Sequence, residues 1–292
     1  MKTILLFALI LCVITTSSFS QVRTRTYFTA AENKEVAAKR KPAKEHTITI
    51  PSEFEQEKNK YITGKNEVTG NYLYKVALPV QVNIDIIKEA EIVRSKDTIH
   101  YLIKGKAPKV YNVSFHFSDF FLSQNTTMFI YTNKQITGPI TEKQNNSNNF
   151  WATIPYNGDE INIELNVPIA QAGISRLIIS KVFLGYADVS GEYFGSPGNS
   201  AACNRNVACP EGVGWDNEKR TVALINMGGT SRGTGALIMN ACGTNIPYFL
   251  TAQHNVADAP NVNQWVFQFQ YWSTDCETNT GFNDNIQYTE LS

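Results

Sequence analysis

The residues that could do chemistry lie near the end of the chain, where the apolar run Tyr248–Leu250 leads through Thr251-Ala252-Gln253 to His254. A histidine with an unperturbed pKa of about 6.5 can take up and return a proton near neutral pH. Such a base can activate a serine hydroxyl, which is a weak nucleophile on its own. We therefore expect His254 to be a catalytic general base. The alternative is a surface histidine at a strand end.

The other members of a Ser-His-Asp triad are not evident. Only 38 residues follow His254, and Asp258, Asp275 and Asp284 among them lack the apolar strand context of a buried orienting carboxylate. No Gly-x-Ser-Gly segment follows the histidine. Ser196 lies before it, in a segment whose composition is typical of a linker. The sequence therefore predicts one triad member, His254, and does not supply its partners.

Several local motifs precede this histidine in a fixed order. They are Cys203 and Cys209 before Pro210-Glu211-Gly212, then Gly214-Trp215, Gly228-Gly229-Thr230, Thr234-Gly235-Ala236-Leu237-Ile238 and Phe249-Leu250-Thr251-Ala252-x-His254. Taken together, this stretch resembles the secreted lysyl endopeptidases, a bacterial branch of the chymotrypsin-like serine proteases. Thr-Ala-x-His alone would be a weak motif, and the ordered set carries the resemblance.

The resemblance implies a β-barrel protease domain with His254 as its general base, a protein or peptide substrate cleaved after lysine, and neither a cofactor nor a metal. In the family order the aspartate and the serine follow the histidine at a greater distance than this chain allows. We therefore expect the chain to be the amino-terminal fragment of a longer serine endopeptidase precursor, inactive alone. The alternative is a truncated, inactive relative.

The mature cysteines cluster in the last third of the chain. An exported protein with clustered cysteines is typically disulfide-bonded, and the cysteine spacing does not favour the alternative of a zinc site. The resemblance implies a bond between Cys209 and Cys276. It places a second bridge at Gly233 and Asn255, where both cysteines are missing together. It gives Cys203 a partner further downstream, whereas Cys242 matches no family position.

Residues 1–20 have the pattern of an export signal, with Lys2 before the apolar run Ile4–Ile14 and small residues that favour cleavage after Ser20. A lipoprotein signal at Cys12 is the alternative. No later segment is long and apolar enough to span a membrane. The sequence thus predicts a secreted or periplasmic protein.

The rest of the chain divides by composition. Residues 21–70 form a charged, solvated leader. Residues 71–186 alternate apolar and polar side chains in short runs separated by turns such as Thr137-Gly138-Pro139, which predicts an antiparallel β-sandwich that serves as a pro-region or accessory domain. Residues 187–202 form a linker, and 203–292 the truncated trypsin-like domain. The fold class is therefore all-β. We expect His100 and His116 to be half-exposed strand residues.

The net charge of the chain is zero, which gives no reason to expect nucleic acid as a partner. Residues 21–202 carry a net charge of +3 and residues 203–292 one of −4. This balance suits an intramolecular contact between the pro-region and the protease part. The alternative function is a non-enzymatic, exported β-sandwich binding protein in which the protease part is a degenerate relic.

Overall fold

The structure is a computed structural model. It describes residues 22–26, 43–62, 74–133, 135–186, 205–243, 246, 248–259, 261–272, 276 and 287–290. The predicted signal peptide (1–20) and linker (187–202) lie outside the described residues, as do Ser196, Cys203, Asp275 and Asp284.

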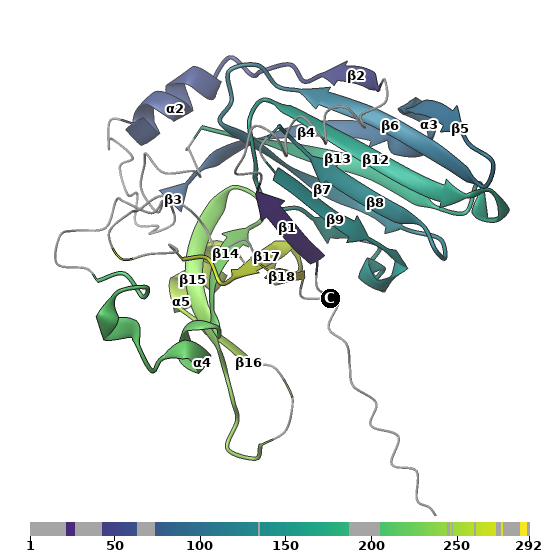
Figure 1. The fold of residues 1–292 in the computed structure, drawn as a ribbon. Helices are drawn as coiled ribbons and strands as arrows, with labels where there is room; N and C mark the ends of the chain where they lie inside the picture. The colour runs from purple at the N-terminus through teal and green to yellow at the C-terminus, as the bar shows by residue number, and fades with distance from the viewer. Residues whose placement is uncertain are drawn as a thin grey trace, which may run out of the picture.

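The described part of the chain is mainly β-strand, arranged in two sheets with few helices (Figure 1), which confirms the all-β prediction. The larger sheet contains β1 (Val22–Thr26), β2 (Lys44–Thr47), β3 (Tyr74–Lys75), β5 (Glu91–Arg94), β6 (Thr98–Lys106), β8 (Thr127–Tyr131), β9 (Gln135–Ile140), β12 (Glu160–Pro168), β14 (Val222–Met227), β15 (Ser231–Ile238), β16 (Tyr248–Thr251), β17 (Trp265–Phe269) and β18 (Gln287–Glu290).

The smaller sheet contains β4 (Ala77–Asp85), β7 (Asn112–Phe121), β10 (Trp151–Ala152), β11 (Tyr156–Asn157) and β13 (Arg176–Gly185). The helices among the described residues are α2 (Phe54–Ile62), α3 (Ile86–Glu89), α4 (Asp216–Lys219) and α5 (Gln253–Asp258), with 3₁₀ turns η1 (Glu142–Gln144), η2 (Ile169–Gln171), η3 (Pro210–Gly212) and η4 (Val262–Gln264).

Alternation of apolar and polar residues determines how the strands of residues 74–186 pack. In β12, every second side chain from Ile161 to Val167 is buried, and β12 pairs antiparallel with β6 on one edge and β8 on the other. These buried side chains meet those of the smaller sheet in one core, where the rings of Phe120 and Trp151 stack at 5.1 Å. Burial of such side chains contributes about 1.5–3 kcal/mol each.

Part of the predicted leader joins this core. β2 pairs parallel with β6, and the side chain of Phe54 at the start of α2 is fully buried, with its ring edge-on to Tyr186 at 6.3 Å. The described residues 43–62 therefore pack against the sheets rather than standing wholly in solvent.

The predicted turn at Thr137-Gly138-Pro139 is wrong, because these residues lie inside β9. The register with β8 shifts from Met128↔Ile140 to Ile130↔Thr137, so β9 accommodates one extra residue as a bulge. Gly138 has a φ of +138°, and a Cβ there would lie 2.7 Å from a ring carbon of Phe129. Glycine is therefore required by this irregularity within a strand, not by a chain reversal.

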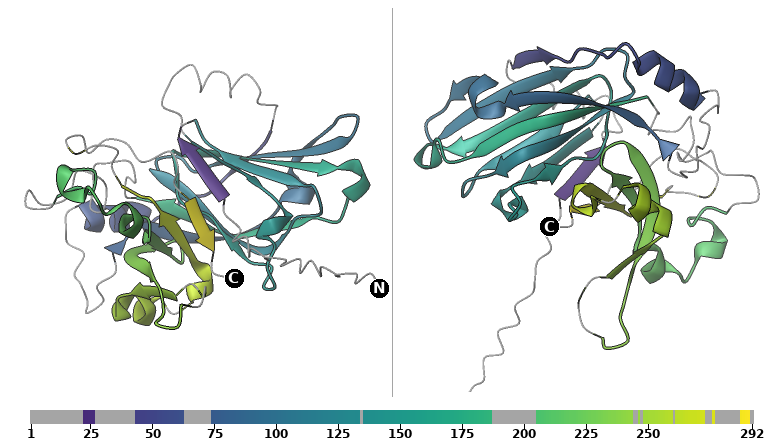
Figure 2. Two further views of the ribbon diagram at one scale, coloured as in Figure 1. Left: turned by 60° about the horizontal axis from the view of Figure 1, so that its bottom comes forward. Right: turned by 180° about the vertical axis from the view of Figure 1, so that it is seen from behind.

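The two halves of the described chain pair with each other through their backbones (Figure 2). We call residues 43–186 the amino-terminal part and residues 205–290 the carboxy-terminal part. β1 pairs with β9 of the first and β18 of the second, and β3 pairs with β15. Val266 of β17 packs into the core cluster of the amino-terminal part.

The expectation for His116 is also wrong. β7 is buried on both faces along most of its length, so His116 is only 3 % exposed, with the rings of Phe183 at 4.4 Å and Phe150 at 5.1 Å. Burial, reinforced by the charge of Lys181, lowers the pKa of His116 to about 3. His100 on β6 is half-buried, as expected, and lies within hydrogen-bonding distance of Asn166.

This burial predicts acid sensitivity. In the unfolded chain His116 binds a proton below about pH 6.5, whereas in the folded chain it stays neutral to about pH 3. As the pH falls from 6.5 to 3, the free energy of unfolding should therefore decrease by up to roughly 1.4 kcal/mol for each pH unit. Above pH 6.5 the contribution of His116 to stability is fully present. Urea unfolding at pH 7 and pH 4 should show a smaller pH-dependent loss for His116→Phe than for the wild type. His100→Gln serves as the control, and equal losses in the wild type and His116→Phe would contradict the assignment.

Candidate functional site

His254 is the second residue of α5, which begins directly after β16. β16 pairs antiparallel with β15 in the register Gly235↔Thr251 and Leu237↔Phe249, and β15 pairs with β14. The apolar run Tyr248–Leu250 forms this strand, but it is partly exposed rather than buried, and His254 lies beyond its end, inside a helix. The short helix that carries it was not foreseen, because six residues give too little periodicity to recognise.

A small apolar cluster supports the strands that lead to His254. It is formed by Ala223, Ile225, Met227, Trp265 and Phe267, with Phe249 of β16 packed against it. The rings of Phe249 and Phe267 meet edge to face at 4.7 Å. Packing of this kind gives β16 a defined position and with it the start of α5.

Hydrogen bonds fix α5 at both ends. The hydroxyl of Thr251 donates to the carbonyl oxygen of Thr234 on β15 (2.8 Å) and accepts from Nδ2 of Asn255 (2.8 Å), whose side chain is buried. At the other end, Nε1 of Trp265 donates to the carbonyl oxygen of Ala259 (3.1 Å). The backbone that carries His254 is thus tied to β15 and β17, while the histidine itself is half-buried and open to solvent on one side.

The structure does not bring a complete triad together among its described residues. Asp258 is the last residue of α5, while Asp275, Asp284 and Ser196 lie outside the described residues. The geometry around His254 is therefore that of a positioned imidazole at a strand-to-helix junction. Its role as a base remains a prediction.

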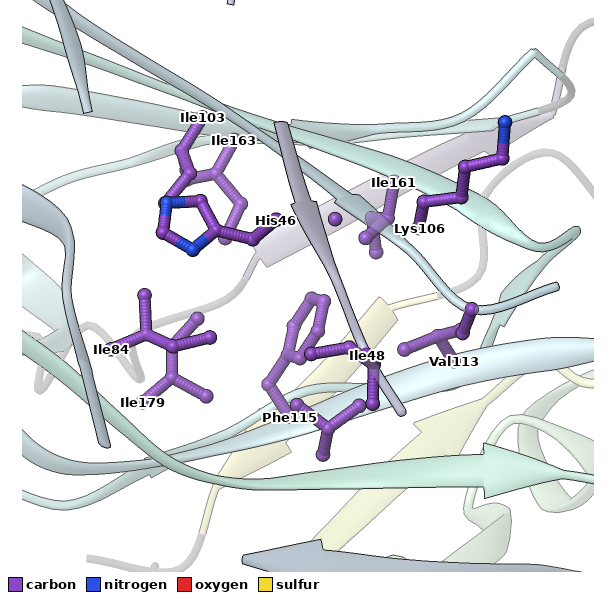
Figure 3. Close-up of a pocket in the computed structure, with 13 residues that line it drawn as sticks. His46, Ile48, Ile84, Ile103, Lys106, Val113, Phe115, Ile161, Ile163 and Ile179 are labelled. Carbon is purple, nitrogen blue, oxygen red and sulfur yellow. The ribbon is translucent and has the colours of Figure 1, made fainter. Parts of the chain in front are cut away.

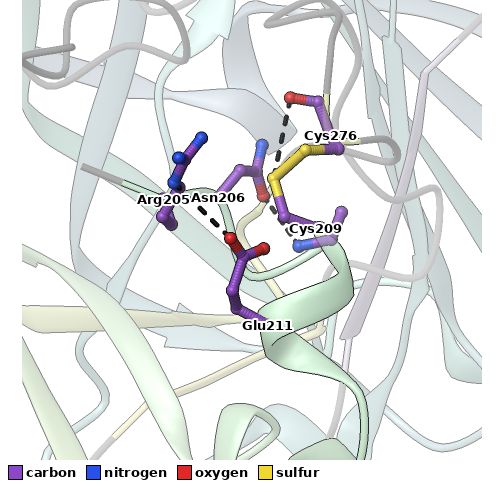
Figure 4. Close-up of a disulfide and its surroundings, with 6 residues drawn as sticks. Arg205, Asn206, Cys209, Glu211 and Cys276 are labelled. Carbon is purple, nitrogen blue, oxygen red and sulfur yellow. Dashed lines mark hydrogen bonds and ion pairs between the residues drawn. A yellow bond between two sulfur atoms is a disulfide. The ribbon is translucent and has the colours of Figure 1, made fainter. Parts of the chain in front are cut away.

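One disulfide fastens the beginning of the carboxy-terminal part to the segment after β17 (Figure 4). Cys209 and Cys276 are joined, with their Cα atoms 4.4 Å apart, and they are the pair that the resemblance implied. Near the bond, Nε of Arg205 lies 3.5 Å from a carboxylate oxygen of Glu211. Cys242, in the connection between β15 and β16, is an exposed free thiol.

The positions of the missing second bridge are adjacent in space. A Cβ built on Gly233 would lie 2.7 Å from Nδ2 and 3.0 Å from Cγ of Asn255. Gly233 is on β15 and Asn255 directly follows His254, so this is the point at which the helix rests on the sheet. Asn255 holds the contact here through its hydrogen bond to Thr251 rather than through a covalent bond.

Residues 197–292 match the family model of the lysyl endopeptidase C-terminal domain. The match covers the whole described carboxy-terminal part, including α5 and the disulfide, and it relates this part of the chain to the lysyl endopeptidases. No solved structure matches the chain.

A cavity in the amino-terminal part does not involve this lysyl endopeptidase-related region (Figure 3). It encloses about 30 Å³ between the two sheets and is lined by aliphatic side chains such as Ile103, Ile163 and Ile179, with the ring of His46 reaching in from β2. A space of this size could hold a water molecule or two, but the apolar walls offer them few partners.

Two kinds of feature are absent from the described residues. No group of three or more His, Cys, Asp or Glu side chains among them could hold a metal ion. None of their helices combines the length and the hydropathy that crossing a membrane requires.

The contact between Gly233 and Asn255 gives a direct test of the site geometry. In the double variant Gly233→Cys/Asn255→Cys, one sulfur would replace Cγ of Asn255, which lies 3.0 Å from the Cβ position of residue 233. We expect a disulfide to form on air oxidation and to stabilise the fold by up to about 3 kcal/mol. Peptide mapping by mass spectrometry should find the bond. Each single variant is a control, and free thiols at both positions in the folded protein would show that α5 does not rest on β15 as described.

Proposed function

We propose that this chain is the amino-terminal portion of an exported serine endopeptidase precursor in which His254 is the general base. The observation that carries the proposal is the position of His254. It begins a helix anchored to β15 and β17, within the stretch that matches the lysyl endopeptidase model. A base must be held firmly and remain accessible, and the half-buried His254 satisfies both conditions.

In this proposal His254 takes the proton from a serine hydroxyl as the oxygen attacks a peptide carbonyl. It then returns the proton to the leaving amine, and the same exchange with water releases the acyl group. We assign the serine and the orienting aspartate to polypeptide beyond these 292 residues, because no Gly-x-Ser-Gly segment follows His254 here. The chain alone should then not catalyse.

The exposed surface of the carboxy-terminal part supports an incomplete β-barrel. Within the described residues β16 pairs only with β15, and its side chains Tyr248 and Leu250 are 46 % and 60 % exposed. An open strand edge with apolar side chains is a surface that proteins normally cover. Further strands of the same domain would do so.

The amino-terminal part would be the β-sandwich pro-region or accessory domain. Its two sheets enclose one core, and it contacts the carboxy-terminal part through the pairing of β3 with β15. The disulfide and the apolar amino-terminal run suit secretion or export to the periplasm. The substrate would be a protein or peptide, and the name of the matched family suggests cleavage after lysine.

The proposal is tested by reading the gene beyond the codon for Ser292. An in-frame continuation that encodes an apolar-flanked aspartate and a Gly-x-Ser-Gly segment would support it. A stop codon directly after Ser292 would contradict an active enzyme and favour the exported binding protein. Turnover of a lysyl ester by the purified 292-residue chain, blocked by a serine-directed phosphonate, would contradict both the binding protein and the assignment of the serine to another segment.

In the longer product, His254→Ala should lower kcat by roughly 10⁴- to 10⁶-fold, because the serine loses its base while substrate binding is retained. His100→Gln is the matched control, since His100 is a half-buried histidine of the amino-terminal part, and it should leave kcat unchanged. Peptidase assays with a lysyl substrate measure both. A His254→Ala enzyme with wild-type kcat would mean that another residue is the base.

A further inference from the structure

The helix that carries His254 turns a polar side chain toward the sheet. Of residues 251–257, all of which the structure describes, only Asn255 is buried, with 3 % of its surface exposed. Its neighbour Val256 is 44 % exposed, although burying a valine would cost less than burying an amide. α5 therefore rests on β15 through an amide rather than an apolar side chain (Figure 1). A buried amide in this position requires a specific hydrogen-bond partner.

Two hydrogen bonds in series connect Asn255 to the sheet. Nδ2 of Asn255 donates to the hydroxyl oxygen of Thr251 (2.8 Å), and this hydroxyl donates to the carbonyl oxygen of Thr234 on β15 (2.8 Å). Because the single hydroxyl proton of Thr251 is given to Thr234, its oxygen accepts from Asn255, and the NH₂ group of the amide must face it. A hydroxyl that donates and accepts at once strengthens both bonds. We call these three residues the Asn255 network.

Gly233 leaves the space that the amide of Asn255 occupies. A Cβ built on Gly233 would lie 2.7 Å from Nδ2 and 3.0 Å from both Cγ and Oδ1 of Asn255. Gly233 is not among the glycines with a positive φ, so its backbone conformation does not by itself require glycine. Glycine is needed here because a side chain would displace the amide.

α5 cannot fix its own orientation. It is six residues long, and an isolated helix of this length is not stable in water. Within it, the backbone N–H of Asn255 donates to the carbonyl oxygen of Ala252 (3.1 Å), and the N–H of Ala259 donates to the carbonyl oxygen of Asn255 (3.1 Å). The direction of the neighbouring His254 is therefore set by the contacts of α5 with the sheet, among which the Asn255 network is the nearest in sequence.

The network stands where the family resemblance places a disulfide, between positions 233 and 255. Three features must be present together for it to form: the amide of Asn255, the hydroxyl of Thr251 and the absence of a side chain at Gly233. Thr251 ends β16 and Asn255 directly follows the histidine, so the network holds the backbone on both sides of His254. Loss of either hydrogen-bonding side chain would leave its buried partner unsatisfied.

We propose that Asn255 and Thr251 are positioning residues for the reaction proposed for His254. Their network, which contains no cysteine, holds the base at the angle from which it can take the proton of a serine hydroxyl. Such a base tolerates little movement, since a displacement of about 1 Å can lower the rate by about 10²-fold. The inference rests on the proposed function for the meaning of that angle. The network itself is a property of the fold and can be tested without catalysis.

The first test measures hydrogen exchange in the 292-residue chain. Asn255→Ala and Thr251→Val should each accelerate exchange of the amides of residues 255 and 259 by at least about tenfold, while amides of β14 keep their protection. Thr251→Ser retains the hydroxyl and should exchange like the wild type. Asn261→Ala is the matched control, because Asn261 is an exposed asparagine shortly after α5 whose side chain does not cap η4. Unchanged exchange in both Asn255→Ala and Thr251→Val would overturn the proposal.

A double-variant comparison tests whether Gly233 and Asn255 fit together as described. Gly233→Ala alone should accelerate exchange of the same two amides, because its methyl group would collide with the amide of Asn255. In the Asn255→Ala background the same substitution should have little further effect, since the colliding atoms are gone. An equal effect of Gly233→Ala in both backgrounds would contradict the contact on which the network depends.

The second test uses the longer gene product and a lysyl substrate. Asn255→Ala and Thr251→Val should lower kcat by roughly 10- to 100-fold and leave KM nearly unchanged, because the base is displaced while the groups that bind substrate are not. Thr251→Ser and the oxidised Gly233→Cys/Asn255→Cys variant should keep most of kcat. Wild-type kcat in Asn255→Ala, in an enzyme that His254→Ala inactivates, would overturn the positioning role alone. Retained activity in His254→Ala would instead count against the proposed function.

Discussion

Burial of β7 and β13 on both faces is the constraint on which most of this structure depends. One face of these strands closes the core with the larger sheet, and on the other face the ring of Phe183 lies against Gly229 in the turn between β14 and β15. A strand covered on one face only could have kept His116 half-exposed and Phe183 in solvent. Because the second face is covered, the packing of the two parts of the chain is coupled. A substitution in either part would change the surroundings of the rings of His116 and Phe183.

The sequence predicted the strands of the amino-terminal part well, because alternation in runs such as Ile161–Val167 reports directly on which face is buried. It could not predict His116, since Ser114, His116 and Ser118 look like the solvent face of β7 until a second layer is known. It also misassigned Gly138-Pro139. Gly-Pro usually marks a chain reversal, and only the pairing partners of β9 show that it forms a bulge within a strand.

At the candidate site, the motif around His254 located the residue but not what holds it. The hydroxyl of Thr251 and the amide of Asn255 connect three backbone segments within a few residues, yet neither side chain stands out by type in a sequence. The proximity of Gly233 and Asn255 could be anticipated only through the family resemblance. The number of residues between Gly233 and Asn255 does not by itself predict that a residue on a strand will contact a residue on a helix. Long-range pairing, such as that of β3 with β15, is invisible to local patterns for the same reason.

The bond between Cys209 and Cys276 has a consequence for how this molecule would respond to proteolysis. It encloses β14, β15, β16 and α5 in a single covalent loop. A single cut anywhere inside that loop, including in the exposed connection that carries Cys242, would leave both pieces attached to each other. In an oxidising compartment such a nicked molecule would remain one covalent unit, heavier only by the water added in the cleavage. The damage would become visible only after the sulfur bridge had been reduced.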